Sequence, residues 1–135
     1  MKNYALEKQS ESAAQACLMT WAQFQANLLP GIDLLHAIPN GGHRHIAVAR
    51  KMKQEGVRAG VPDLGLPVAR GGHHGLYSEM KAEHKRPVKG GAGGVDPAQE
   101  VWIRRLNEEG FLAVVCWGWE EAARTIETYL KNNKP

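Results

Sequence analysis

The chain has 135 residues, of which 43% are hydrophobic and 23% charged, and its formal net charge is +3. This length fits one domain, and this composition is typical of a globular protein rather than a disordered one. The N-terminal stretch MKNYALEKQSES has no apolar core of a secretory signal, and no window suits a membrane span, so we expect a cytoplasmic protein without a membrane partner.

The first two predicted elements are a helix and a strand. Apolar residues recur at helical spacing over residues 10–28, and Ser10 is a suitable N-cap, so this stretch is expected to be helical until LLPG ends it. The short apolar run DLLHAIP at 33–39 predicts the first strand, and the PNGG that closes it is a strong turn signal.

A short amphipathic helix is predicted next, within residues 43–56. Ile46, Ala49 and Met52 fall on one side of this helix and are expected to face the core, whereas basic side chains fall on the other side. Gly56 is typical of the residue that follows a helix.

The two extended runs that follow are expected to pair as a hairpin. Residues 61–68 are extended, with Pro62 and Pro67 confining regular pairing to the middle of the run. ARGGHHG predicts a turn, and LYSEMKA at 76–82 predicts the next strand. Residues 83–94 form a basic, glycine-rich stretch without periodicity, which predicts a loop.

The C-terminal part predicts a helix, a buried strand and a closing helix. VDPAQEVWIRRLNEEG has Asp96 as N-cap, Pro97 at the first helical position and Gly110 past the end. FLAVVCWGW predicts the strand, and EEAARTIETYLKN the amphipathic closing helix. The order α-β-α-β-β-α-β-α predicts an α/β sandwich around a mixed sheet, one domain over residues 1–135 with its core at about 10–131.

The strand at 76–82 places an acid and a base on one face. Side chains alternate along a strand, so Glu79 and Lys81 point the same way, with the Met80 carbonyl beside them. Alone, such a pair is more often a solvated surface couple. Asp63 changes this interpretation, because aspartate is disfavoured in strands and this one lies across the predicted hairpin from Glu79. Two converging carboxylates are tolerable around a hard cation such as Mg²⁺, and a lysine there can contact the scissile phosphate or the attacking water.

Basic residues are concentrated in the middle of the chain. Between His36 and Gly94, ten Lys and Arg stand against four acids, a local excess of six, whereas the rest of the chain sums to −3. This pattern is expected of a polyanion-binding face, with a solvated charged surface as the alternative. The candidate contacts to backbone phosphates are Arg44, Arg50, Lys53, Arg58, Lys85, Arg86 and Lys89. Such contacts would position DNA without reading its sequence.

Together, GVPDL at 60–64 and EMK at 79–81 resemble the PD-(D/E)XK nuclease superfamily. The closer resemblance is to the VRR-NUC family (virus-type replication-repair nucleases), including its stand-alone phage and bacterial members. SESAAQ, IPNGG and DPAQEVWIRRLNEEG are similar, in the same order, to the family's first helix, its turn after the first strand and its glutamine-bearing helix. The resemblance covers residues 11 to 130 and implies a restriction-endonuclease-like fold.

The resemblance also implies metal-dependent hydrolysis of DNA phosphodiester bonds. The implied ligands of Mg²⁺ or Mn²⁺ are Glu11, Asp63, Glu79 and the Met80 carbonyl. Lys81 would orient or activate the attacking water and stabilise the developing charge, and Gln99 would position Lys81, the water or the phosphate. Glu11 could equally be a residue at the start of the helix whose negative charge interacts favourably with the helix dipole, or a cap residue.

The favoured function is therefore a Mg²⁺- or Mn²⁺-dependent endodeoxyribonuclease selective for branched DNA, such as Holliday junctions or flaps, in replication, repair or recombination. A homodimer is expected by analogy, because a two-fold partner suits a symmetric junction. KGGAGG lacks the G-K-[ST] ending of a phosphate loop, so no nucleotide cofactor is expected. The alternatives are a non-catalytic DNA-binding or assembly module with this fold, and a nicking or restriction-like endonuclease on linear duplex.

Overall fold

The computed structural model describes residues 9–39, 45–88 and 94–133. The elements are α1 (Glu11–Phe24), η2 (Ile32–Leu34), β1 (His36–Ala37), α2 (Ile46–Gln54), β2 (Leu64–Leu66), β3 (Leu76–Lys81), η3 (Glu83–Lys85), α3 (Pro97–Glu108), β4 (Leu112–Trp117) and α4 (Trp119–Lys131). The order of α-helices and strands confirms the predicted arrangement. None of the described helices combines the length and the apolar character that crossing a membrane requires.

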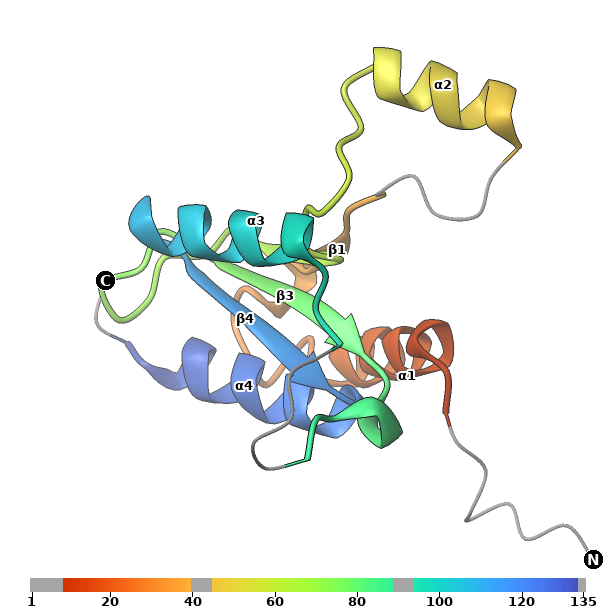
Figure 1. The fold of residues 1–135 in the computed structure, drawn as a ribbon. Coiled ribbons are helices and arrows are strands. Elements are labelled where there is room, and N and C mark those ends of the chain that lie inside the picture. The colour runs from red at the N-terminus through yellow and green to blue at the C-terminus, as the bar shows by residue number, and fades with distance from the viewer. Residues whose placement is uncertain (1–8, 40–44, 89–93, 134–135) are drawn as a thin grey trace, which may run out of the picture.

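The four strands form one mixed sheet in the order β1-β2-β3-β4. β1 with β2 and β2 with β3 are antiparallel pairs, whereas β3 and β4 run parallel. Figure 1 shows α3 over one face of the sheet, with α1 and α4 over the other. β3 therefore lies between two strands and between two helical layers, and every one of its side chains except the half-buried Tyr77 is buried.

The main core lies between the sheet and the layer formed by α1 and α4. Leu18 of α1, Ile126 of α4, Leu64 of β2 and Leu76 of β3 are all 0% exposed. Burying each such side chain contributes about 1.5–3 kcal/mol. This layer supports β3 from the side opposite α3 and gives the strand a rigid backing.

Local signals start the two helices that lead into the site. The Ser10 side chain accepts a hydrogen bond from Ala13 N at 3.1 Å and begins α1, as predicted. Asp96 caps α3 by accepting a hydrogen bond from Gln99 N, and the Gln99 side chain accepts one from Asp96 N in a capping box, with Pro97 in the first turn. Both helix starts are therefore encoded within a few residues.

Two predictions in the N-terminal third are wrong in detail. α1 ends at Phe24, and Leu28, predicted within the helix, is 71% exposed because the turns after α1 bring Leu29 into the core instead. The first strand covers only His36–Ala37, since the beginning of the apolar run forms the 3-10 turn η2. Ile32 of this turn, at 1% exposed, supplies the burial expected of a strand.

Helix α2 departs furthest from expectation. No residue of α2 is buried, and Ile46 and Val48 are 72% and 47% exposed. The prediction that Ile46, Ala49 and Met52 face the core is wrong, because α2 stands clear of the layers around the sheet (Figure 1). The helix is amphipathic as predicted, but its apolar side is not part of the core.

Candidate active site

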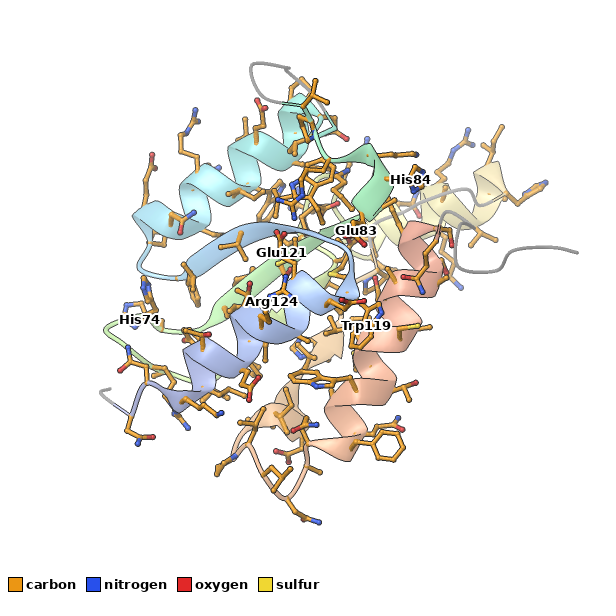
Figure 2. The ribbon with its side chains drawn as sticks, turned by 90° about the horizontal axis from the view of Figure 1, so that it is seen from below. His74, Glu83, His84, Trp119, Glu121 and Arg124 are labelled. Carbon is orange, nitrogen blue, oxygen red and sulfur yellow. The ribbon has the colours of Figure 1, made fainter. Side chains whose placement is uncertain are left out.

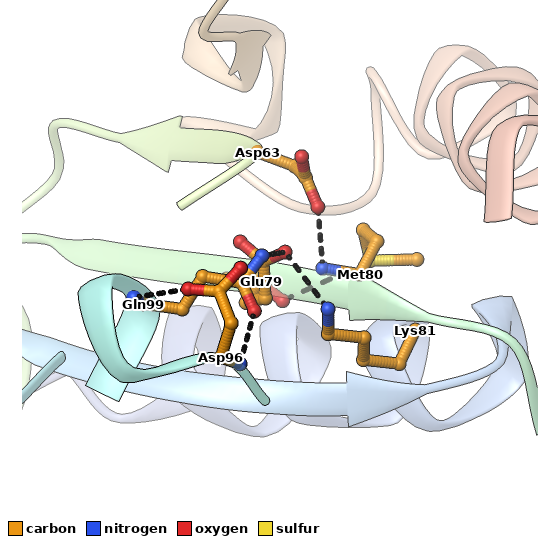
Figure 3. Close-up of polar contacts among 7 residues, drawn as sticks. Asp63, Glu79, Met80, Lys81, Asp96 and Gln99 are labelled. Carbon is orange, nitrogen blue, oxygen red and sulfur yellow. Dashed lines mark hydrogen bonds and ion pairs between the residues drawn. The ribbon is translucent and has the colours of Figure 1, made fainter. Parts of the chain in front are cut away.

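Asp63 is attached to the backbone of β3. It is the residue before β2, and β2 pairs Leu64 with Ser78, so Asp63 lies level with the middle of β3. Its Oδ2 accepts a hydrogen bond from Met80 N at 2.8 Å (Figure 3). The Met80 side chain is 1% exposed within the core, so Met80 serves the site through its backbone. The predicted approach of Asp63 to the EMK segment is thus present in the structure.

Glu79 is a buried carboxylate, and only one of its two oxygens has polar partners among the described residues. Its Oε1 accepts a hydrogen bond from Gln99 Nε2 at 2.8 Å and lies 3.7 Å from Lys81 Nζ (Figure 3). Its Oε2 is buried, and the described part of the chain offers it no hydrogen-bond donor. An unsatisfied buried acceptor costs about 1–3 kcal/mol. Glu79, which is 2% exposed, therefore has one carboxylate oxygen that no described donor satisfies.

The surroundings of Glu79 oppose its negative charge. Burial, followed by the neighbouring charge of Asp63, raises the pKa of the Glu79 carboxyl to about 8, while the Lys81 ammonium opposes the rise. The charge of Glu11 is the smallest of the contributions to this rise in the pKa of Glu79. Acidic groups thus meet at a place where a bound cation would relieve the repulsion between them.

Gln99 links the start of α3 to the site. Its Oε1 accepts a hydrogen bond from Asp96 N at 3.1 Å, which leaves its Nε2 to donate to Glu79. The capping box therefore fixes which end of the amide faces the carboxylate. Gln99 is expected to position Lys81, the water or the phosphate, and in the structure its Nε2 donates to Glu79 Oε1, the same oxygen that lies 3.7 Å from Lys81 Nζ. Asp96, which orients Gln99, was recognised only as a helix cap, although the D-x-x-Q spacing was readable in the sequence.

Glu11 lies at the open side of the site. It is exposed in the first turn of α1, and with Asp63 it lines a hollow of about 430 Å³ whose other residues are Ser12, Gln15, Ala16 and Met19. This hollow gives solvent and ligands a route to the Asp63 carboxylate. The structure therefore brings Glu11 to the acidic cluster, at its exposed edge.

The donor set fits a hard divalent cation. Within the described residues, no three His, Cys, Asp or Glu side chains are close enough to form a ready-made metal centre. What the chain offers is the Asp63 and Glu79 carboxylates, the unsatisfied Oε2 and an open hollow that admits water. Mg²⁺ commonly binds through one or two carboxylates plus waters and substrate phosphates, so these residues fit such an ion.

The backbone of Lys81 is fastened at the junction of the sheet with α4. Gly118 N donates a hydrogen bond to Lys81 O at 2.8 Å. Just beyond, Arg86 forms an ion pair with Glu121, whose Oε1 also accepts a hydrogen bond from Trp117 N at 3.3 Å. Figure 2 views this junction from the α4 side, with Glu83 and His84 of η3 labelled near Glu121. Arg86, a predicted phosphate contact, is therefore engaged within the chain.

The remaining predicted DNA contacts are spread over the surface. The exposed ones are Arg50, Lys53, Arg58 and Lys85. Arg44 and Lys89 lie outside the described residues. The stretch at 83–94 was predicted to lack regular structure, which is wrong for its start, where residues 83–85 form η3. The partner of Arg86, Glu121, was missed because nothing in the local sequence connects the two residues.

Comparison with known proteins identifies similar chains. The family model described as the VRR-NUC domain matches residues 4–119. A solved structure described as a "VRR_NUC domain protein" is 32% identical to this chain, with a TM-score of 0.74 over 95% of this chain and 93% of that one. No curated protein matches significantly. The matched range covers the segments of Asp63, Glu79, Lys81 and Gln99.

Proposed function

The chain belongs to the VRR-NUC family and is a nuclease of the PD-(D/E)XK type, and from this premise we propose that it is a Mg²⁺- or Mn²⁺-dependent endodeoxyribonuclease that acts on branched DNA. One observation carries the proposal. The buried Glu79 carboxylate is held between Asp63, Lys81 and Gln99 with its Oε2 unsatisfied. This arrangement costs stability unless the site binds a cation, so it favours an active metal-dependent centre over a DNA-binding module that has lost catalysis.

The proposed metal ligands are Asp63, Glu79 and the Met80 carbonyl, with Glu11 at the open edge. Bound there, Mg²⁺ or Mn²⁺ would supply Lewis acidity toward a phosphate oxygen and lower the pKa of water. Lys81 Nζ lies beside Glu79 in a largely buried position, where its charge can orient the attacking water and stabilise the negative charge that develops on the phosphate. Gln99 keeps Glu79 in place and is a positioning residue.

Selectivity for branched DNA is supported by the distribution of cations. Arg50 and Lys53 are exposed on α2, which projects away from the sheet (Figure 1). Arg58, between α2 and β2, and Lys85, in η3, are also exposed. Contacts between such residues and backbone phosphates carry no base information, so the shape of the DNA would determine where the enzyme binds. This supports a structure-selective nuclease, with a role in replication, repair or recombination, over a sequence-reading one.

A homodimer is part of the same proposal. Phe24, Leu28 and Leu34 are 79%, 71% and 49% exposed, and all three lie in the short stretch that ends α1 and enters η2. Exposed apolar side chains in one region are typical of an interface. Sedimentation velocity is expected to give a dimer that Leu28→Ser weakens. A monomer at all concentrations, with and without junction DNA, would contradict this part of the proposal.

The function is tested with a panel of DNA substrates. The purified protein is incubated with a four-way junction, a flap and a linear duplex of matched sequence, with Mg²⁺, Mn²⁺ or EDTA. We expect cleavage of the branched molecules with either metal and none in EDTA. Cleavage that survives EDTA contradicts the metal mechanism, and equal cutting of linear and branched DNA contradicts structure selectivity. Salt-sensitive junction binding without any cutting would favour the non-catalytic module.

A further inference from the structure

A second hollow lies along α3, on the helix that carries Gln99 into the active site. It measures about 470 Å³ and is lined by Arg58, Val101, Trp102, Arg105, Leu106 and Glu109. This volume is within the range of about 300–1,000 Å³ that small-ligand sites occupy. Trp102 and Leu106 are only half-buried, and Val101 is 41% exposed. The outer part of α3 therefore offers apolar surface to solvent.

This hollow adjoins the active site. Trp102 follows Gln99 by three residues and so lies on the same side of α3, about one turn further along the helix. Arg58 belongs to the segment that leads to Asp63, and this segment crosses α3 closely at Gly60, where a Cβ would be 2.8 Å from the Ala98 backbone. One wall of the hollow thus leads to Gln99 and the other to Asp63.

The chemistry of the lining is that of a nucleotide site. An aromatic ring and two aliphatic side chains form the apolar part, and Arg58 and Arg105 are exposed beside it. Neither guanidinium forms an ion pair with a described residue, whereas the neighbouring Arg104 lies 3.7 Å from Glu108. Glu109 adds one negative charge, which can accept a hydrogen bond from a base amino group. Aromatic surface flanked by arginines is how proteins hold unpaired nucleotides, through stacking and phosphate contacts.

We propose that this hollow binds one unpaired nucleotide of the DNA substrate, with its base stacked on Trp102 and its phosphate between Arg58 and Arg105. A base within a duplex must first be unpaired and unstacked before it can enter, whereas an unpaired base at a flap does not incur this cost. The inference rests on the proposed function in taking DNA as the substrate. It adds the structural reason for a branched preference, because the enzyme would recognise an unpaired nucleotide close to the scissile phosphate.

Binding in EDTA tests the site without requiring cleavage. The probe is a flap DNA with 2-aminopurine at the first unpaired nucleotide, compared with a linear duplex that carries 2-aminopurine at a paired position. Stacking on Trp102 is expected to quench the flap probe. Trp102→Leu should abolish this quenching and weaken flap binding about 5- to 160-fold, the range for loss of one stacked base. Trp102→Phe should preserve most of the quenching and most of the flap affinity. The affinity for the linear duplex should be the same in the wild type and both variants.

A matched arginine pair provides the charge test. Arg105→Gln is expected to weaken flap binding and lower the salt slope by about one, whereas Arg104→Gln, one residue away and paired with Glu108, should change neither. Unchanged flap binding and quenching in Trp102→Leu would overturn the inference, as would equal effects of the two arginine variants. Dissociation of a protein dimer by Trp102→Leu would assign the hollow to a second copy and also overturn it. Loss of flap preference by Trp102→Leu with no cleavage by any variant would support the hollow and reject the nuclease, so the two failures are distinguishable.

Discussion

Gln99 Nε2 donates a 2.8 Å hydrogen bond to Glu79 Oε1, and this single contact ties the capping box of α3 to the buried carboxylate of β3. The helix start and the acid site are therefore one structural unit. The Glu79 oxygen that Gln99 does not occupy is the one without a donor in the described chain. The position of α3 thus determines which oxygen of Glu79 has a hydrogen-bond donor and which does not.

Gln99→Glu is the sharpest test of this link. Glutamate keeps an acceptor for the Asp96 amide but replaces the donor to Glu79 by a repulsive carboxylate. We expect cleavage to fall by about 10- to 100-fold, the usual effect of losing an outer partner of a metal ligand, and the melting temperature without metal to fall as well, because buried Glu79 loses a donor and gains a like charge beside it. Gln99→Ala should lose both hydrogen bonds, and with them both activity and stability. Full activity of Gln99→Glu in a kinetic assay would contradict the assigned role.

The raised pKa of Glu79 predicts how stability depends on pH in EDTA. Below about pH 4.5, the ordinary value, the carboxyl is protonated in both the folded and unfolded states and costs nothing. Between 4.5 and the folded pKa of about 8, the unfolded state loses its proton first, so folding becomes less favourable as pH rises. The free energy of unfolding should fall by on the order of a few kcal/mol across this pH range.

Urea denaturation of the wild type and Glu79→Gln across this pH range measures the effect. The wild type should lose stability toward pH 8, whereas the variant, which has no carboxyl to ionise, should show a flatter profile. Mg²⁺ should restore wild-type stability at pH 8 and have little effect on the variant. Parallel dependence of the free energy of unfolding on pH in the two proteins would show that the surroundings of Glu79 do not disfavour its ionised form.

Two glycines with similar φ angles test the crossing of the Asp63 segment over α3. Gly56 and Gly60 have φ values of +102° and +91°, but a Cβ meets nothing within 4 Å at Gly56 and lies 2.8 Å from the Ala98 backbone at Gly60. Gly56→Ala should therefore cost only the left-handed strain, about 1–2 kcal/mol. Gly60→Ala should cost about 1–3 kcal/mol more from overpacking.

Cleavage by these two variants separates the site from general stability. Gly60→Ala is expected to reduce activity because Ala98 adjoins Gln99, whereas Gly56→Ala should keep it under conditions where both proteins are folded. Equal free energies of unfolding and equal activities for the two variants would show that the close approach at Gly60 has no role.

The Arg86–Glu121 ion pair predicts a coupled pair of variants. The two side chains are 52% and 26% exposed, so their coupling in a double-mutant cycle of stability should be within about 1 kcal/mol. Arg86→Ala and Glu121→Ala should lower cleavage to a similar degree, with no further loss in the double variant, because both release the loop that follows Lys81. Weaker DNA binding by Arg86→Ala alone, with Glu121→Ala unaffected, would instead identify Arg86 as a phosphate contact.

Much of the site could be predicted because its signals are short-range. Asp96 and Pro97 predict the start of α3. The hairpin brings Asp63 to β3, because the alternation of side chains along the strands and the position of the turn set the register of the hairpin. The sequence does not predict which side chain Gln99 Nε2 contacts. This contact depends on where α3 lies over the sheet, which no local pattern specifies.

The failures have a common physical cause. The periodicity of residues 46–54 correctly predicts an amphipathic helix, but periodicity does not tell whether a layer exists for its apolar side to cover, and Ile46 is 72% exposed. Trp102 has the same ambiguity, as a helical aromatic that lines a hollow instead of the core. Pairing of Arg86 with Glu121 joins residues far apart in sequence, so only the tertiary structure reveals it.

Single-turnover cleavage of a labelled four-way junction in Mg²⁺ tests the central claim most directly. Wild type is compared with Asp63→Asn, which keeps the size of the side chain, and with Lys81→Met, which keeps an unbranched apolar stem. We predict that each variant binds the junction in EDTA with wild-type affinity. The single-turnover cleavage rate of each variant in Mg²⁺ should be at least about 100-fold lower than that of the wild type, the scale for losing one charge-stabilising group. Wild-type rates in Asp63→Asn or Lys81→Met would contradict the assignment of catalysis to these residues.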